Sequence, residues 1–326
     1  MRPSLASLLA LGLLVLASCH GGAATEAQPS RWTRLTEAAP YPGSYNFPVH
    51  VAADGRFVAL HPEGSWSSRD GVNWTREALA PVPVNTAYMP LIQHKGAAWA
   101  LGAHRGNYQG FTIDPVIRRT SGDYRAWETV GRSPTLPKLV FMGAASFDGS
   151  IWLLGGFDGK AESNAVWRSA DGIAWERVAE HAPWSPRAKP SVVVFRDRLW
   201  VLGGGAIDGA QANDAWSSAD GVNWTRETAS IVTPAPTGFT AQVFDRRLWL
   251  VGANRSGEFR SEMLVSADGR TWTAVSAPWT PRGGVATWTD GKRMYLTGGK
   301  YSYPVNGEPK FVYSNDVWAM DAGGER

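Results

Sequence analysis

Two arginines, Arg187 and Arg282, are the side chains best suited to hold an anion, because they occupy equivalent places in an internal repeat. Each lies thirteen positions before a large residue, Trp200 or Tyr295, that marks the same strand of the repeat. A guanidinium binds a carboxylate through two parallel hydrogen bonds. The spacing therefore predicts that both arginines ring the mouth of a ligand site. The alternative is that they bond loop carbonyls or neighbouring acids.

Neighbouring positions in other copies of the repeat carry aromatic rings and a lysine. Aromatic faces stack on the apolar faces of ring-shaped ligands such as sugars, and a lysine adds positive charge. Arg105 lies in a long loop that could fold over the site or simply cover it. The predicted ligand-binding residues are Arg187, Arg282, Lys138, Tyr88, Phe47, Phe239 and Arg105. Together they suit an anionic or sugar-like ligand.

Residue patterns typical of catalysis are mostly missing. The six histidines show no spacing of two or four residues that would predict a metal site. The sequence has neither a phosphate-binding glycine loop nor a G-x-S-x-G nucleophile motif. Carboxylates are plentiful, but a sequence cannot show which of them come together in space. No catalytic residue, metal or cofactor is therefore predicted.

The candidate residues belong to a repeat of strand, tight turn and strand that recurs along nearly the whole chain. Repetition at a fixed period decides the fold before any other pattern. The second strand of each copy is marked by Val58, Trp99, Trp152, Trp200, Trp249 and Tyr295. A tryptophan that opens another strand recurs at Trp74, Trp127, Trp175, Trp224 and Trp272. The repeated tryptophans are expected to pack one repeat against the next, since each ring buries about 150–250 Å².

The N-terminal segment supplies a strand that the repeats lack. Arg31 to Leu35 (RWTRL) matches the strands at Asn73 (NWTRE) and Ala174 (AWERV), and the chain stops soon after Trp318, one strand short of a unit. These patterns predict an all-β fold of six four-stranded units in a ring, sealed by the N-terminal strand. Closure protects the sheet edges, whereas a linear solenoid would need capping repeats at both ends.

Residues 31–321 resemble the kelch family of β-propellers. The resemblance rests on glycine pairs after second strands and on third strands that begin with asparagine and carry a tryptophan. The pairs are Gly155-Gly156, Gly203-Gly204 and Gly298-Gly299, and the third strands begin at Asn164, Asn213 and Asn315. The match is weaker in the first two units. The resemblance implies a six-bladed kelch-type β-propeller, its last blade closed by the N-terminal strand, and it supports Arg187 and Arg282 as ligand contacts.

Four Asp-Gly segments resemble the Asp-box of sialidases. They end at Trp74, Trp175, Trp224 and Trp272, and each is one residue shorter between aspartate and glycine than that box. The functional alternative is a relative of the glycosidases. An Asp-Gly pair is, however, a strong hairpin signal by itself. These segments are therefore interpreted as turns of the scaffold.

Loop lengths predict which face of the ring carries the ligand site. Links between first and second strands, and most links between third and fourth strands, are short. Links between second and third strands and between units are long and rich in glycine, proline and polar residues. Binding residues concentrate in long loops on a rigid scaffold. The face formed by the long links, called the long-loop face below, is the predicted functional face.

The first eighteen residues have the features of a signal peptide. Arg2 precedes an apolar run, Leu5 to Ala17, which is shorter than the roughly 20 residues of a spanning helix. Leu16-Ala17-Ser18-Cys19 resembles a bacterial lipobox, which implies that Cys19 carries the lipid. The alternative is an ordinary secretory signal with an incidental cysteine. The predicted organisation is a signal peptide at 1–18, a lipidated flexible tether at 19–30 and a propeller at 31–321.

Localisation and partners follow from the leader and the composition. The lipobox resemblance, with no aspartate after Cys19, implies a lipoprotein held to the outer membrane of a bacterial cell envelope. Cys19 is the single cysteine, so no disulfide is expected within the fold. A net charge of +3 without a cluster of lysine or arginine argues against nucleic acid as a partner. A monomer is expected.

Two classes of function remain open. The first is a lipid-anchored binding or assembly module that presents the long-loop face to a glycan, peptide or envelope partner. The second is an envelope enzyme on a sugar acid, similar to the kelch-type sialic acid mutarotase. Galactose oxidase chemistry is excluded, since it needs a cysteine-linked tyrosine and Cys19 lies in the leader. Binding is preferred because a fold alone confers no activity. Paired acids in the site would favour the enzyme, and an aromatic site without them favours binding.

Overall fold

The computed structural model describes residues 32–78, 83–107 and 109–323. In these residues the chain is all β and contains no helix. The strands form six antiparallel sheets of four or five strands each. The predicted all-β class is therefore confirmed, and the arrangement is consistent with a β-propeller. The predicted signal peptide, the tether and Cys19 lie outside the described residues.

The first four sheets along the chain each contain four strands that pair in sequence order. The first comprises β2 (Val49–Val51), β3 (Phe57–His61), β4 (Gly64–Ser68) and β5 (Thr75–Arg76). The second comprises β6 (Leu91–His94), β7 (Ala97–Asn107), β8 (Gly110–Thr120) and β9 (Trp127–Arg132). The third comprises β10 (Gly143–Phe147), β11 (Ser150–Leu154), β12 (Val166–Ser169) and β13 (Glu176–Ala179). The fourth comprises β14 (Ser191–Phe195), β15 (Arg198–Leu202), β16 (Ala215–Ser218) and β17 (Trp224–Thr228).

The last two sheets contain five strands, because a long hairpin strand extends beyond the four-stranded unit. The fifth comprises β18 (Pro236–Thr237), β19 (Thr240–Phe244), β20 (Arg247–Arg255), β21 (Glu258–Ser266) and β22 (Thr273–Ser276). The sixth comprises β1 (Trp32–Thr36), β23 (Gly283–Thr289), β24 (Arg293–Val305), β25 (Glu308–Tyr313) and β26 (Val317–Asp321).

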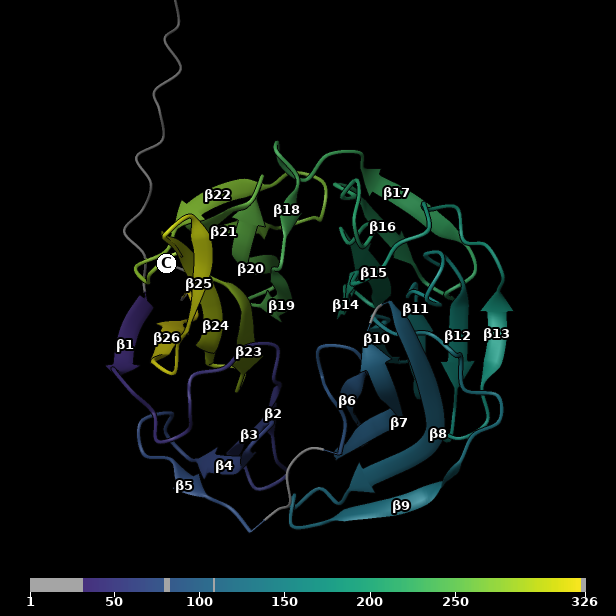
Figure 1. The fold of residues 1–326 in the computed structure, drawn as a ribbon, viewed down its shortest axis with the longest axis horizontal. Coiled ribbons are helices and arrows are strands. Elements are labelled where there is room, and N and C mark those ends of the chain that lie inside the picture. The colour runs from purple at the N-terminus through teal and green to yellow at the C-terminus, as the bar shows by residue number, and fades with distance from the viewer. Residues whose placement is uncertain (1–31, 79–82, 108, 324–326) are drawn as a thin grey trace, which may run out of the picture.

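The sheets follow one another around a common axis, with β2, β6, β10, β14, β19 and β23 nearest to it (Figure 1). Strand β2 of the first sheet contacts β23 of the last, so the two ends of the series lie side by side. Strand β1 joins the last sheet as its outermost strand by pairing antiparallel with β26, with Trp32 opposite Met320 and Thr33 opposite Ala319.

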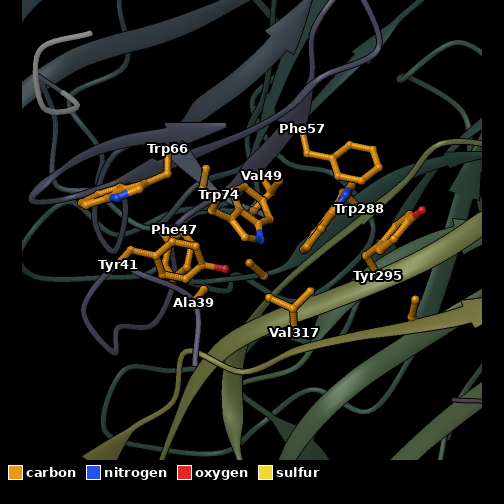
Figure 2. Close-up of a cluster of buried hydrophobic side chains, with 13 residues drawn as sticks. Ala39, Tyr41, Phe47, Val49, Phe57, Trp66, Trp74, Trp288, Tyr295 and Val317 are labelled. Atoms are coloured by element: carbon orange, nitrogen blue, oxygen red, sulfur yellow. The ribbon is translucent and has the colours of Figure 1, made fainter. Parts of the chain in front are cut away.

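A buried aromatic cluster fills the space between the first and the last sheet (Figure 2). Tyr41, only 1% exposed, meets the ring of Trp74 edge-on at a centroid distance of 5.4 Å. On the other side, Trp288 stacks on Tyr295 with centroids 5.1 Å apart. Buried aromatic pairs of this kind add about 0.5–1.5 kcal/mol beyond their buried area. The core therefore holds together residues from both ends of the chain.

The Asp-Gly segments form turns, as their sequence predicts. In the third sheet, Asp171 Oδ1 accepts hydrogen bonds from the backbone N–H groups of Ile173 and Ala174, both at 2.8 Å. Asp70, Asp220 and Asp268 make the same pair of bonds in their own turns. The carboxylates thus satisfy backbone amides of the scaffold.

Candidate functional site

A cavity of about 1170 Å³ opens among the loops that lead into the innermost strands. Its wall includes residues of the innermost strands or of the loops that lead into them in all six sheets, together with the loop after β15 and the hairpin between β20 and β21. These are the links that define the long-loop face. A concave site of this size on a rigid scaffold is the usual form of a ligand site, although its volume exceeds the roughly 300–1,000 Å³ typical for small molecules.

Six residues at equivalent positions, one at or just before the innermost strand of each sheet, surround the cavity and are called the cavity ring below. They are Asn46, Tyr88, Phe141, Lys189, Gly238 and Gly284. Asn46, Phe141 and Lys189 adopt left-handed backbone conformations, with φ angles of 52°, 60° and 53°. Such conformations cost residues other than glycine about 1 kcal/mol or more and cluster at functional sites. The repeated conformation shows that the fold directs these positions in the same way in several sheets.

Backbone hydrogen bonds link the cavity ring across neighbouring sheets. Four of its residues donate their N–H to the carbonyl of the ring residue in the preceding sheet, at N···O distances of 2.7 to 2.9 Å. The donor–acceptor pairs are Phe141–Tyr88, Lys189–Phe141, Gly284–Gly238 and Asn46–Gly284. Among the described residues, no such bond joins Gly238 to Lys189 or Tyr88 to Asn46. The ring is therefore bonded in two arcs, and Lys189 lies at the end of one of them.

The cavity wall carries several aromatic rings and few charged residues. Its rings belong to Tyr45, Phe47, Tyr88, Phe141, Phe239 and Phe259. Its charged residues are two lysines, Lys189 and Lys300, and one carboxylate, Asp208. Of the described residues that line it, none is a histidine, a glutamate or an arginine. The arrangement can bind an anion next to ring faces, and it offers no pair of acids for proton transfer.

The structure brings together three of the residues predicted for ligand binding. Phe47, Tyr88 and Phe239 all line the cavity. The Tyr88 ring stacks on His104 at a centroid distance of 4.4 Å and lies 4.7 Å from Phe141. Burial lowers the pKa of His104 below 6.5, so this imidazole is a neutral support for the Tyr88 ring at pH 7. Whether these three rings contact a ligand remains a prediction.

Arg187, by contrast, is fully buried and does not line the cavity. It donates five hydrogen bonds inside the fold. The acceptors are the carbonyls of Ser185 (3.0 Å) and Gly203 (3.0 Å), Ser185 Oγ (2.9 Å), Asp214 Oδ1 (2.7 Å) and Asp214 Oδ2 (3.2 Å). A guanidinium has five N–H donors. Arg187 therefore has no donor left for a ligand, and its predicted place at the site mouth is corrected.

Arg282 repeats this arrangement in the last sheet. It is 2% exposed and pairs with Asp316, with Nη1···Oδ1 at 2.5 Å and Nη2···Oδ2 at 3.1 Å. Asp214 and Asp316 also accept hydrogen bonds from the indoles of Trp216 and Trp318, both at 2.8 Å. Both arginines thus pair with neighbouring acids, the alternative already open from the sequence. Their spacing reflected a repeated internal bond of the scaffold.

The remaining predicted residues lie away from the cavity. Lys138 is exposed and lines a smaller hollow of about 560 Å³, together with Trp175 and His181. Arg105 is exposed on the outer part of β7 and is not part of the cavity wall. Cys19, the predicted lipidation site, lies outside the described residues. The structure therefore does not bring Lys138 and Arg105 together with the cavity, and it does not describe Cys19.

Sequence reasoning missed Lys189, although a signal for it was present. Lys189 lies eleven positions before Trp200, and the other ring residues precede their own strand markers by eleven or twelve positions. Counting back eleven positions instead of thirteen would have found every residue of the cavity ring except Asn46, which lies twelve positions before Val58. Lys300, in β24 of the last sheet, is also absent from the predicted set. The two lysines are therefore the cationic groups that the structure adds to the site.

No protein-family model matches this chain, and no curated protein does. Within the part of the chain that the structure describes, no helix is long and apolar enough to cross a membrane. The same part contains no group of three or more histidine, cysteine, aspartate or glutamate residues placed to hold a metal ion. The cavity and its lysines are thus the main guide to function.

Proposed function

We propose that this protein is a lipid-anchored binding module of the bacterial cell envelope, and that its ligand is an acidic glycan held in the cavity of the long-loop face. The observation that carries the proposal is the composition of the cavity wall. Among the residues that the structure describes, six aromatic rings and two lysines surround a space with a single carboxylate, Asp208. Ring faces and ammonium groups recognise an acidic sugar, whereas acid–base catalysis on that sugar would call for paired proton-transfer groups.

The scaffold we propose is a six-bladed kelch-type β-propeller closed by the N-terminal strand. Six antiparallel sheets and the pairing of β1 with β26 support it. The glycine pairs and asparagine-led third strands support the kelch assignment. Closure of this kind would leave only short, protected sheet edges, which fits a monomer that presents one face to its ligand.

The membrane anchor we propose is a lipid on Cys19. The apolar leader and the LASC motif support it, and residues 19–30 would let the propeller reach away from the outer membrane. Expression of a Cys19→Ala variant in a bacterium with labelled fatty acid tests this directly. The wild type should carry the label and partition with membranes, and the variant should do neither. Equal labelling of both would contradict the proposal.

A cavity-filling variant tests the binding site. Gly238 belongs to the cavity ring and has a φ angle of 65°. A Cβ added there would meet no other atom within 4 Å. Gly238→Phe should therefore fill part of the cavity at a cost of about 1–2 kcal/mol in backbone strain. In a glycan and sugar-acid binding screen, we expect the wild type to retain acidic glycans and the variant to lose them.

Gly149→Phe is the matched control, because Gly149 has a φ angle of 67° and equally empty surroundings. It lies in the turn between β10 and β11, at the opposite end of β10 from the cavity ring. If both variants still bind the acidic glycan, the cavity is not the binding site and the proposal is wrong on this point. If the wild type interconverts the anomers of a sugar acid, the protein is a mutarotase-like enzyme, and the proposal of a binding module is wrong.

A further inference from the structure

Two lysines of the cavity wall each hold their ammonium over an aromatic ring. Lys189 Nζ lies 4.3 Å from the centroid of the Phe141 ring. Lys300 Nζ lies 4.3 Å from the centroid of Tyr45 and 4.7 Å from that of Phe311. Contacts of this kind restrict an otherwise flexible side chain through the attraction between the cation and the ring. Both ammonium groups are therefore held at the cavity.

The two lysines come from different sheets, so their relative placement depends on the whole fold. Lys189 precedes β14 in the cavity ring, and its N–H is bonded to the Phe141 carbonyl at 2.8 Å. Lys300 is part of β24, where it lies opposite Tyr313 of β25. Both elements are fixed by backbone hydrogen bonds. The cavity thus has two preorganised cationic positions, which lowers the entropy lost on binding.

The charges of this site are unbalanced in favour of an anion. Burial lowers the pKa of Lys189, and the charge of Lys300 lowers it further, while Asp208 opposes this effect. Burial also lowers the pKa of Lys300. Two ammonium groups that destabilise each other gain from a bound carboxylate. Asp208 is the single acidic residue among the described residues of the wall. The two lysines therefore outnumber the carboxylates, and the wall has an excess of positive charge.

An aromatic surface continues from Lys300 along the β24–β25 hairpin. Lys300 pairs with Tyr313 and Ser302 pairs with Phe311, so both rings lie on the Lys300 face of the hairpin. Tyr313 stacks on Tyr45 of the cavity wall at a centroid distance of 5.6 Å. Phe311 and Tyr313 are nevertheless 42% and 44% exposed. Large exposed rings next to a cavity mark a contact surface for a ligand or partner.

We propose that the cavity takes the acidic end sugar of an oligosaccharide, with its carboxylate between Lys189 and Lys300, and that the next sugar ring lies on Phe311 and Tyr313. This inference rests on the proposed function, and it names the ligand class and the two subsites. The volume of about 1170 Å³ and the ring faces beyond it accommodate more than one sugar. An acidic peptide strand would instead bind through backbone hydrogen bonds at an open sheet edge.

Calorimetric titration of the purified protein, residues 19–326, tests the carboxylate subsite. The probes are galacturonic acid, galactose, trigalacturonic acid and a tetraglutamate peptide. Lys189→Met and Lys300→Met should each weaken galacturonic acid and trigalacturonic acid by about tenfold, since each removes a charged hydrogen-bond donor. The preference for the acid over galactose should disappear in the double variant. Lys310→Met is the control, because Lys310 lies on the other face of the hairpin, opposite Tyr303.

The second subsite is tested by Phe311→Ala and Tyr313→Ala. Each should weaken trigalacturonic acid by about fivefold and affect galacturonic acid less, because the single sugar lacks the second ring that would lie on Phe311 and Tyr313. Thermal unfolding should stay within a few degrees of the wild type, since neither ring is buried in the core.

The outcomes separate this inference from the proposed function. Glycan binding that Gly238→Phe abolishes but the lysine variants leave intact overturns the inference and keeps the proposed function. Tetraglutamate binding with an affinity equal to that of trigalacturonic acid also overturns the oligosaccharide assignment. Absence of any glycan binding by the wild type, in these titrations and in the wider screen, overturns both.

Discussion

At the scale of the residue, the structure assigns opposite roles to two basic side chains that lie two positions apart. Arg187 is fully buried, and its pair with Asp214 ties the loop before β14 to the start of β16. Burial alone would raise the pKa of Asp214, but the hydrogen bonds from Arg187 and Trp216 lower it below 3.8. Lys189 instead is exposed and opens onto the cavity. One residue holds the scaffold, and the other supplies charge to the site.

Removal of the buried arginine should be costly. Arg187→Ala leaves Asp214 without its ionic partner in a site closed to most solvent, and breaking a buried pair in this way costs about 3–5 kcal/mol. Arg260→Ala is the control, since Arg260 and Glu258 form an exposed pair at 2.7 Å worth about 0–1 kcal/mol. Unfolding in urea, followed by tryptophan fluorescence, measures both free energies. Equal losses in the two variants would contradict the structural role of Arg187.

Binding of an acidic sugar should depend on pH through the two lysines. Their pKa values are lowered in the free protein, and a bound carboxylate favours the charged ammonium, so binding takes up protons. Affinity for galacturonic acid is therefore full while both lysines are protonated and falls as the pH rises, at values below the ordinary lysine pKa of 10.5. The sugar carboxylate stays ionised throughout this range.

Titrations at increasing pH measure this dependence, with galactose as the neutral control. The galactose affinity should stay constant over the interval in which the galacturonic acid affinity falls. A galacturonic acid affinity that is constant up to pH 10.5 would show that neither lysine holds the carboxylate.

At the scale of the element, the Asp-Gly turns join neighbouring sheets. The turn glycine of one sheet lies against the tryptophan that marks the preceding sheet, as Gly221 does against Trp152. Gly221 has a φ angle of 73°, and a Cβ there would lie 2.1 Å from Cζ3 of the Trp152 ring. Gly172 and Gly269 take the same position against Trp99 and Trp200. The turn motif therefore serves packing between sheets, which explains why it recurs with the tryptophans.

Gly221→Ala should destabilise the protein through this contact. Trp152 is 2% exposed and cannot move aside, so overpacking adds about 1–3 kcal/mol to the backbone strain. Gly149→Ala carries a similar strain, with a φ angle of 67°, but meets nothing within 4 Å. Its cost should stay near 1 kcal/mol. Chemical unfolding of both variants measures the difference, and a smaller loss for Gly221→Ala would argue against the proposed packing.

At the scale of the whole molecule, residues from the two ends of the chain meet in one sheet and one core. Trp32 of β1 lies opposite Met320, and both side chains are buried in the same cluster. Asn315 donates hydrogen bonds to the carbonyls of Ala39 and Tyr41 at 2.9 and 3.0 Å. These contacts span almost the full described chain. The stability of the last sheet therefore depends on strand β1, which comes from the N-terminal end of the described chain.

Truncation tests this dependence. A chain that begins at Ala38 lacks β1, so it loses the Trp32 ring from the core and exposes the edge of β26. Loss of a buried tryptophan side chain alone costs about 3–5 kcal/mol, and an open edge invites aggregation. A chain that begins at Arg31 keeps β1 and is the control. Calorimetry should show a lower, broader transition for the shorter chain; identical transitions would contradict the contribution of β1 to the last sheet.

The sequence by itself determined the class of the fold and the repeat. Strand periodicity, turn glycines and tryptophan spacing are local features, so they can be recognised without knowing which strands meet. They placed Phe47, Tyr88 and Phe239 near the innermost strands, where the structure has them in the cavity wall. The same spacing argument placed Arg187 at the site, where it does not lie. Equivalent spacing shows that two residues share a role, but it does not show which role that is.

Only the tertiary structure decided which basic residue faces the cavity. Arg187 turns inward because Asp214, 27 positions away, meets it across the sheet. Lys189 turns toward the cavity in a left-handed conformation, with its N–H bonded to Phe141 of the preceding sheet. Lys300 joins it from the last sheet of the chain. Contacts between residues far apart in sequence set these directions, and they arise when the sheets assemble around a common axis.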